Sequence, residues 1–329
     1  MTVNFLVTRA IPEPGMSLLR TAGTVTVPED LLDSSALNDA CRSGDYQIVV
    51  AHLSDRFDED ILQHARIGGI SNYAVGVNNI DIDSATRRSI MVANTPGVLL
   101  TEATADVAML LLLAVARRCV EADQFLRDGR FTGWQPELLL GHGVGGKRLG
   151  LAGFGRIARA TARRALAFGM EVVFCPRPPN AGDARRTDLG ELGGLVTQID
   201  WYELLETSDY VSLHVPLTTS TTHLVDVEAL TRMKSTAILI NTSRGPVVDE
   251  GALVEALRQG WIAGAGLDVF EHEPAVTPGL VDLPNTVLLP HVGSATVPVR
   301  NEMARLCALN AIAMGSNETP PHPVNPEAW

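Results

Sequence analysis

An alternation of short apolar runs with segments of helical periodicity extends along almost the whole chain of 329 residues. This alternation is typical of parallel sheets whose strands are connected by covering helices. The first block has expected strands at 3–8, 24–27, 47–51, 69–72 and 90–93; the second has them at 149–152, 171–175, 193–196, 210–214, 236–241, 262–269 and 286–289. The sequence therefore predicts an α/β fold with two parallel-sheet domains.

Two helical segments indicate how the blocks are connected. Residues 101–129 form one expected long helix, apolar in its first half and polar in its second, which suits a crossing between domains. A final helix is expected at 297–314, where the chain would return to the first block. The second domain, residues 100–290, is thus predicted to be inserted in a first domain made of 1–99 and 291–329.

The charge and cysteine content narrow the classes of partner. With 26 basic and 38 acidic residues the net charge is −12, which argues against nucleic acid and anionic membranes as partners. We find neither an apolar run approaching eighteen residues nor a signal peptide pattern at the N-terminus. Four cysteines without paired spacing indicate reduced thiols in the cytoplasm and no metal cluster.

The stretch "GLAGFGRIARA", from Gly150 to Ala160, has the pattern of a dinucleotide-binding turn. Gly153-x-Gly155-x-x-Ala158 follows an apolar strand and opens a helix, with a second strand about twenty residues later. Gly153 permits the tight turn, and Gly155 lets the backbone approach a pyrophosphate at the helix N-terminus. Although a purely structural turn is the alternative, the context predicts a Rossmann-like second domain that binds a dinucleotide.

Residues with side chains suited to catalysis follow the ends of three later strands. "AILINTSRG" ends in Arg244, "AGAGLDVFEHEP" runs through Asp268 to Glu273, and "TVLLPHVGSA" reaches His291. The carboxyl ends of parallel strands meet at one edge of a sheet, where ligands bind. Arg244 suits a carboxylate, His291 can exchange a proton, and Glu273 could orient its ring. Singly, each has a structural alternative; together they fit hydride transfer between a nicotinamide and a 2-keto or 2-hydroxy acid.

The end of the second strand of this block lacks the acid that NAD-binding folds place there. In "VVFCPRPP" the expected position is Pro176, followed by Arg177, and Arg185 and Arg186 come soon after. An acid would bond the ribose hydroxyls of NAD, whereas a guanidinium suits a 2′-phosphate. NADP(H) is therefore the preferred cofactor and NAD(H) remains possible; a solvated loop that accepts both is the alternative. We interpret Cys175 as a packing residue.

These motifs, with "SLHVPLTTSTTHLV" and "MKSTAILINTSRGPVVDEGALVEAL", resemble the D-isomer-specific 2-hydroxyacid dehydrogenases, most closely the glyoxylate/hydroxypyruvate and 2-ketogluconate reductase branch. The similarity extends from about residue 45 to the end. It implies a flavodoxin-like substrate domain, catalytic roles for Arg244, Glu273 and His291, and a substrate carboxylate held at Val75 and Gly76, with Arg244 and His291.

The resemblance also completes the cofactor site and suggests a partner. The expected cofactor-binding residues are Thr104, Gly153, Phe154, Gly155, Arg156, Ile157, Arg177, Val215, Pro216, Thr222, Thr242, Ser243, Arg244, Asp268, His291 and Gly293. Family members are usually homodimers joined through the nucleotide-binding domains and the long helix. Trp134, in "GWQPELLLGHGVGGK", would then either approach the partner's site or only pack at the interface.

The expected activity is reduction of small 2-keto acids such as glyoxylate, hydroxypyruvate or 2-ketogluconate to D-2-hydroxy acids, with NADPH preferred. Dehydrogenases of 3-phosphoglycerate or phosphite are alternatives. The lack of an added regulatory domain after residue 314 weakens the first. A phosphorylated substrate would also need extra cations near residues 52–56 or 73–78, where only Arg56 is available. A dinucleotide-sensing binding protein without turnover is an alternative from another class.

Overall fold

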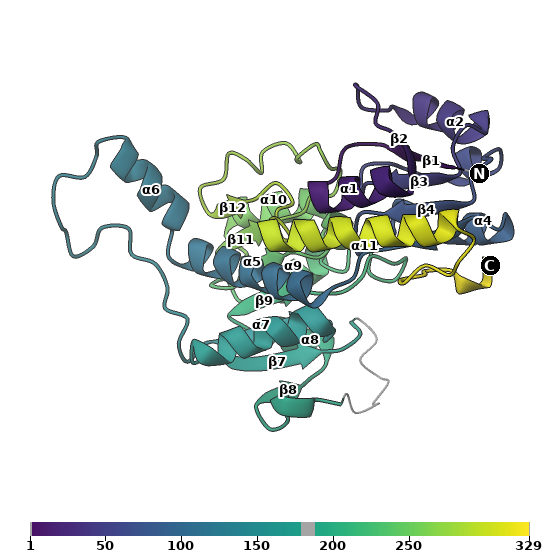
Figure 1. Ribbon diagram of the computed structural model, residues 1–329. Coiled ribbons are helices and arrows are strands. Elements are labelled where there is room, and N and C mark those ends of the chain that lie inside the picture. Colours follow the sequence, from purple (N-terminus) through teal and green to yellow (C-terminus); the bar gives the residue numbers. More distant parts are fainter. Residues whose placement is uncertain (1, 179–187, 329) are drawn as a thin grey trace. The chain divides into compact units, whose positions relative to one another are not determined.

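The computed structural model describes residues 2–178 and 188–328 and shows two compact units (Figure 1). One unit runs to residue 100 and resumes at residue 295; the other comprises residues 101–294. Each unit has its own parallel sheet covered by helices, so the predicted α/β class with two parallel-sheet domains is confirmed.

The sheet of the first unit has five parallel strands. Their bounds are β1 Val3–Val7, β2 Gly23–Thr26, β3 Ile48–Ala51, β4 Gly69–Asn72 and β5 Met91–Ala93. The order β2-β1-β3-β4-β5 is that of a flavodoxin-like sheet. In this order the direction of strand addition reverses between β1 and β3, which is where such folds place their ligands.

Helices from both ends of the chain cover the first sheet. The helix α1 (Glu13–Ala22) packs on α11 (Val297–Gly315), and α11 also lies along β3 and β4. Apolar residues of α2 (Ser34–Ser43), α3 (Glu59–Leu62) and α4 (Ile82–Arg87) pack together with strand residues in another core cluster. The chain therefore returns to the first unit through α11, as expected from its position in the sequence.

The sheet of the second unit has seven parallel strands. They are β6 Arg148–Ala152, β7 Glu171–Cys175, β8 Val196–Gln198, β9 Tyr210–Leu213, β10 Ile238–Asn241, β11 Gly264–Leu267 and β12 Thr286–Leu288. The order is β12-β11-β10-β9-β6-β7-β8, so counting from β6 gives the Rossmann order with one further strand. The reversal between β6 and β9 places a ligand crevice at their carboxyl ends.

Side chains of alternate strand residues divide the second unit into two cores. Leu149 and Leu151 of β6 belong to a cluster with residues of α5 (Val98–Ala116) and α7 (Arg156–Ala167). Strand residues of the opposite parity, such as Leu213 and Leu267, pack with residues of α8 (Trp201–Thr207), α9 (Val227–Arg232) and α10 (Glu250–Gln259). The central strands β9, β10 and β11 are thus buried along their whole length, as is typical of a parallel sheet with both faces covered.

The single long helix expected at 101–129 is wrong. The structure has α5, which ends at Ala116, and a separate α6 (Cys119–Arg127). Arg118 has a left-handed backbone with φ of 52°, and its guanidinium bonds the Glu121 carboxylate and the carbonyl oxygen of Leu140. These contacts stabilise a break that helix propensity alone does not indicate, and α6 then projects away from the sheet (Figure 1).

One expected strand is shifted along the chain. Residues 193–196 were expected to be extended, but β8 comprises Val196–Gln198. Gly194 has a φ of 77°, and a short 3-10 helix, Gly190–Leu192, occupies the preceding turn. A left-handed backbone cannot continue a ladder, so the strand begins later.

The helix α5 has the length and mean hydropathy of a membrane-spanning helix, and it alone does so among the described residues. Core helices pass the same test, and Leu111 and Leu112 of α5 are buried in the core of the second unit.

Candidate active site

The glycine turn lies between β6 and α7, at the reversal of the strand order. Gly153 has a φ of 91°, and an added Cβ would lie 2.8 Å from the carbonyl oxygen of His214. Its amide donates to the carbonyl oxygen of Cys175 at 2.8 Å, which ties the turn to the end of β7. At Gly155 an added Cβ would meet nothing described within 4 Å. Because Gly155 caps α7 without a side-chain hydrogen bond from the described residues, the first amides of α7 can receive an anion.

The turn after β10 contains a buried hydroxyl without a hydrogen-bond partner among the described residues, Thr242 Oγ1. Its neighbour Ser243 donates from both its amide and its hydroxyl to Asn241 Oδ1, and Asn241 Nδ2 donates to the carbonyl oxygen of Arg244. Leaving a buried polar group unpaired costs about 1–3 kcal/mol, which a polar ligand atom would offset. With the open face at Gly155, the unpaired Thr242 hydroxyl shows that the residues present fit a dinucleotide.

His291 and Glu273 form a hydrogen-bonded pair in the second unit. The ring Nδ1 of His291 lies 2.9 Å from Glu273 Oε2, and Glu273 Oε1 accepts from the amide of Phe270 at 3.0 Å. Burial on its own would raise the pKa of Glu273, but the hydrogen bond and charge of His291, the Phe270 amide and the charge of Arg244 together lower this pKa. Glu273 is therefore a carboxylate at neutral pH, and it directs Nε2 to the opposite side of the imidazole ring.

His291 has a left-handed backbone with φ of 53°, which is uncommon for a residue other than glycine. Asp268 holds the residues that follow: its carboxylate accepts from the amides of Val292 at 2.7 Å and Gly293 at 2.8 Å. Burial raises the pKa of Asp268, and these two amides oppose the effect. Asp268 thus anchors the loop that presents His291, a contribution that the sequence did not indicate.

Thr104 joins this loop. An added Cβ at Gly293 would lie 3.0 Å from Asp268 Oδ2 and 3.5 Å from Thr104 Cγ2, so the three residues are neighbours. All three belong to the expected cofactor-binding set, although they are far apart in the sequence.

Arg244 lies on a turn that packs against the chain leading to Glu273. Its Nη1 donates to the carbonyl oxygen of Ser243 at 2.6 Å, and burial lowers the pKa of its guanidinium while Glu273 opposes this effect. The next residue, Gly245, approaches so closely that an added Cβ would lie 1.9 Å from the Phe270 carbonyl. The turn of Arg244 and the loop of Glu273 are therefore in direct backbone contact.

The side chains of the remaining expected cofactor-binding residues differ in their exposure to solvent. Phe154 is buried and stacks on Phe174 with ring centroids 3.8 Å apart, so only its main chain is available to a ligand. Arg156 and Pro216 are exposed, Ile157 is half-buried and Val215 is buried. The exposed Thr222 donates its hydroxyl to the carbonyl oxygen of Thr218 at 3.0 Å.

The end of β7 exposes Arg177 immediately after Pro176. Cys175, the last residue of β7, is fully buried, and burial raises the pKa of its thiol to about 11 despite a backbone hydrogen bond from Arg177. A thiol that stays protonated is a poor nucleophile, which agrees with packing rather than chemistry. Arg185 and Arg186 lie outside the described residues.

In the first unit, two amide side chains fix the loop after β4. Asn94 Nδ2 donates to the carbonyl oxygen of Val75 at 2.7 Å, and Asn72 Nδ2 donates to that of Gly76 at 2.9 Å. Because trans peptides are planar, the amides of Gly76 and Val77 point the opposite way. The loop can thus present N–H donors to an anion, while the role of Val75 and Gly76 in holding the substrate stays a prediction.

A second group of this unit lies at the carboxyl ends of β1 and β3. Asp55 Oδ2 accepts from the Thr8 hydroxyl at 2.5 Å and from the amide of His52 at 2.8 Å. The His52 ring nitrogen Nε2 lies 2.7 Å from the carbonyl oxygen of Arg9, and burial lowers the pKa of His52. Thr8 and Asp55 are 47 residues apart, and nothing in the sequence indicated this contact. No group of three or more possible metal ligands occurs among the described residues.

A Rossmann sheet with an open glycine turn, an orphaned hydroxyl and an Arg, Glu and His together define a nicotinamide-dependent oxidoreductase. Residues 109–293 match the sequence pattern of the D-isomer specific 2-hydroxyacid dehydrogenase, NAD binding domain. The chain is 46% identical over 332 residues to the glyoxylate reductase of Thermococcus litoralis, covering 99% of this chain and 97% of the relative. The chain belongs to the D-isomer-specific 2-hydroxyacid dehydrogenase family, in its glyoxylate reductase branch, and is an NAD(P)-dependent dehydrogenase.

Solved structures agree with this assignment. A glyoxylate reductase from Paecilomyes thermophila superimposes with a TM-score of 0.86 at 31% identity, covering 100% of this chain and 99% of that one. The NADPH-dependent glyoxylate/hydroxypyruvate reductase of Sinorhizobium meliloti, solved with NADP and malonate, gives a TM-score of 0.85 at 34% identity, covering 100% and 98%. The family expected from the sequence motifs is thereby confirmed.

Proposed function

We propose that the protein reduces glyoxylate and hydroxypyruvate to the corresponding D-2-hydroxy acids, with 2-ketogluconate as a further substrate. The observation that carries this proposal is the His291–Glu273 pair beside the buried Arg244 turn. The glyoxylate reductase of Thermococcus litoralis supports the substrate class.

The expected chemistry follows from the groups present. A bound reduced nicotinamide would supply a hydride to C2 of the keto acid. The imidazolium form of His291 gives a proton from Nε2 to the carbonyl oxygen, so that C=O becomes CH–OH and the imidazole is left neutral. Glu273 holds the ring through Nδ1 and so fixes the direction of Nε2. Arg244, a planar cation, orients the carboxylate and polarised carbonyl.

The proposed preference for NADPH depends on the end of β7. Pro176 has no charge there to repel a 2′-phosphate, and Arg177 offers a guanidinium one residue later. The tie between Gly153 and Cys175 keeps the end of β7 next to the glycine turn. The relative from Sinorhizobium meliloti, which is NADPH-dependent, supports this choice.

We further propose that the protein acts as a cytoplasmic homodimer joined through the arm, defined as α6 with residues 128–147. The helix α6 is at least partly exposed at every position, and the arm exposes Val120, Leu126, Phe131 and Leu140. Trp134 is 84% exposed. So much exposed apolar surface on a projecting segment is typical of an interface.

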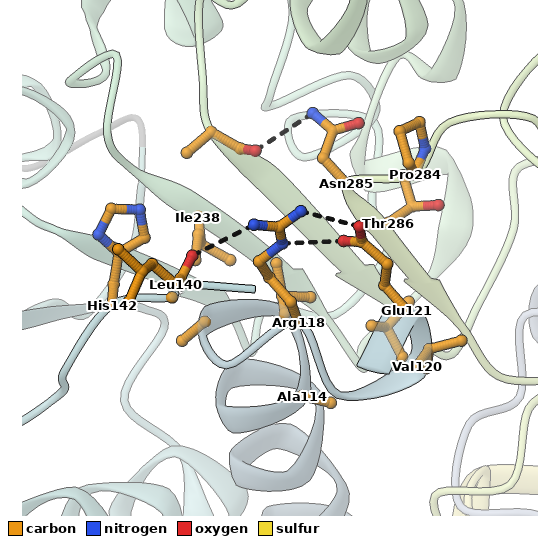
Figure 2. A pocket seen from close by; sticks show the side chains of 15 residues that line it. Ala114, Arg118, Val120, Glu121, Leu140, His142, Ile238, Pro284, Asn285 and Thr286 are labelled. Atoms are coloured by element: carbon orange, nitrogen blue, oxygen red, sulfur yellow. Dashed lines mark hydrogen bonds and ion pairs between the residues drawn. The ribbon is translucent and has the colours of Figure 1, made fainter. Parts of the chain in front are cut away.

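A cavity of about 370 Å³ lies at the base of the arm (Figure 2). Arg118 crosses its centre, held by Glu121 and the carbonyl oxygen of Leu140, while Ile238 and Thr286 line it from the sheet. Ile238 and Thr286 begin β10 and β12, so the cavity lies at the amino edge of the sheet, opposite the cofactor edge. We propose that apolar side chains of a second copy's arm fill it.

Initial rates with glyoxylate, hydroxypyruvate, 2-ketogluconate and 3-phosphohydroxypyruvate, each with NADPH and NADH, test the proposed reaction; phosphite oxidation with NAD or NADP tests the phosphite alternative. We expect the highest kcat/KM with glyoxylate or hydroxypyruvate and NADPH. A higher value for the phosphorylated acid or phosphite would favour those dehydrogenases. Cofactor binding with negligible turnover of every compound would instead favour a sensing protein.

A further inference from the structure

We propose that Glu271 and His223 are positioning residues, which hold the catalytic Glu273–His291 pair by tying the Glu273 loop to the chain after β9 and to α10. The proposal builds on the function proposed above, since it assigns roles to residues next to that site. Four residues form what we call the Glu271 network: His223, Glu250, Glu271 and Thr277.

The centre of the network is a reciprocal pair of bonds between two glutamates. The Glu271 amide donates to Glu250 Oε1 at 2.8 Å, and the Glu250 amide donates to Glu271 Oε2 at 3.2 Å. The Thr277 hydroxyl donates to Glu250 Oε2. Glu250 is 1% exposed and is the first residue of α10. Each carboxylate thus receives backbone or hydroxyl donors, and the loop from 270 to 277 is fastened at two points to the start of α10.

His223 extends the network to the loop after β9. Its Nε2 lies 2.6 Å from Glu271 Oε1, and its amide donates to the carbonyl oxygen of Pro246 at 2.8 Å. The backbone of His223 is left-handed, with φ of 51°, a conformation that these contacts hold in place. The adjacent Thr222 belongs to the expected cofactor-binding set. Glu271 therefore connects the cofactor side of the site to the catalytic loop.

One peptide group transmits the position of Glu271 to the catalytic pair. The Phe270–Glu271 peptide packs directly on Gly245, where an added Cβ would lie 1.9 Å from the Phe270 carbonyl. The amide of Phe270, which belongs to the preceding peptide group, donates to Glu273 Oε1. A shift of Glu271 would therefore move both the turn of Arg244 and the carboxylate that orients His291. A displacement of about 1 Å in such a site can reduce the rate on the order of 10²-fold.

The reaction proposed above leaves Glu271 and His223 without a direct role. His223 is 42% exposed at its side chain and Glu271 only 14%. In the motif "FEHEP" the two glutamates stand two residues apart, and the structure separates their tasks. Glu273 contacts the catalytic histidine, while Glu271 faces His223 and α10.

The test compares Glu271→Ala, Glu271→Gln and His223→Ala with a matched control, Lys234→Ala. Lys234 forms an ion pair of similar exposure with Asp209 at the amino edge of the same sheet, where it touches none of the network residues. We expect kcat with glyoxylate and NADPH to fall at least about tenfold in Glu271→Ala and several-fold in His223→Ala, because misorientation affects the chemical step. Glu271→Gln keeps one oxygen that can accept from the Glu250 amide and an NH2 group that can pair with the His223 ring, so it should retain most of kcat. Lys234→Ala should stay within about twofold of the wild type.

A second measurement does not depend on turnover. Amide hydrogen exchange of Phe270 and its neighbours up to Glu273 should accelerate at least about tenfold in His223→Ala and Glu271→Ala, while exchange in β6 stays unchanged. Wild-type kcat together with unchanged exchange at Phe270 would overturn the proposal, as would equal acceleration across the whole unit, which indicates a structural role only. If the wild type turns over no keto acid, the proposed function fails and the exchange result alone decides on the positioning role.

Discussion

His291 combines a left-handed backbone with a side chain held by one carboxylate. Replacing it should therefore affect catalysis and leave cofactor binding nearly unchanged. We predict that His291→Ala lowers kcat by about 10²–10⁴-fold, the usual effect of removing a catalytic acid. Cofactor binding, measured by fluorescence titration, should stay nearly unchanged because three strands separate β12, which leads to His291, from β6 and its glycine turn. A kcat close to that of the wild type would remove His291 from the mechanism.

Glu273 affects the pH range of activity because its carboxylate, which accepts the hydrogen bond of the His291 ring, can take up a proton at acid pH. The pKa of Glu273 is itself lowered by His291 in spite of burial, so this negative charge persists at neutral pH. In Glu273→Gln this charge is lost at every pH, so the group can no longer take up a proton. The fall of the reductive rate at acid pH that follows protonation of Glu273 should therefore disappear, with a lower rate throughout. An unchanged profile would show that the pair does not act in catalysis.

Arg244 is expected to bind the keto acid through the planar geometry of its guanidinium as well as through its charge. Arg244→Lys keeps the charge but loses the planar, two-pronged donor. We predict a raised KM for the keto acid together with a lowered kcat, each measurable in steady-state assays with saturating NADPH. If only the midpoint of thermal unfolding changes, Arg244 has a structural role.

At the scale of single residues, the sequence indicated which side chains follow the carboxyl ends of the parallel strands. Arg244, Glu273 and His291 could be proposed because strand ends converge in this class of fold. The anchoring of the His291 loop by Asp268 could not be foreseen, since it consists of side-chain bonds to backbone amides 24 and 25 residues away. The division of work between Glu271 and Glu273 was equally hidden, because both occur in one short acidic motif.

At the scale of elements, the end of β7 makes the sharpest prediction about the cofactor. Arg177→Ala should raise KM for NADPH much more than KM for NADH, because only the former loses a charged partner. Pro176→Asp should move the preference toward NADH through repulsion of the 2′-phosphate. Arg20→Ala, which removes an exposed arginine of α1, is the control and should affect neither. A wild type that prefers NADH tenfold, or equal effects on both cofactors, would contradict the proposal.

Elements with strong periodicity were predicted well. A helix end that depends on individual side-chain contacts was not. Most strands of the two sheets contain short apolar runs bounded by turns, so the number of strands followed from the sequence. The break between α5 and α6 depends on Arg118, whose bonds reach Glu121 and the distant Leu140 carbonyl. No pattern in residues 101–129 contains that second partner, and hence the two helices were taken as one.

At the scale of the whole molecule, the arm predicts the oligomeric state. In sedimentation velocity the wild type should have about twice the chain mass of 35.2 kDa. A double change, Phe131→Ser with Leu140→Asp, removes apolar area from the arm and adds a charge beside the cavity, and should shift the protein toward the monomer. Leu31→Ser, an equally exposed leucine of the first unit, should leave the mass unchanged. A wild type that sediments as a monomer at micromolar concentration would contradict the proposed homodimer.

Trp134 allows the two possible uses of the arm to be separated. As an interface anchor alone, its replacement by alanine should weaken dimerisation and leave the steady-state constants of the remaining dimer unchanged, since a buried aromatic residue acts through the area it covers. If its indole instead reaches the partner's site, Trp134→Ala assayed at a concentration that maintains the dimer should raise KM for hydroxypyruvate more than for the smaller glyoxylate. The ratio of the two KM values, measured beside sedimentation of the same sample, decides between packing and a shared site.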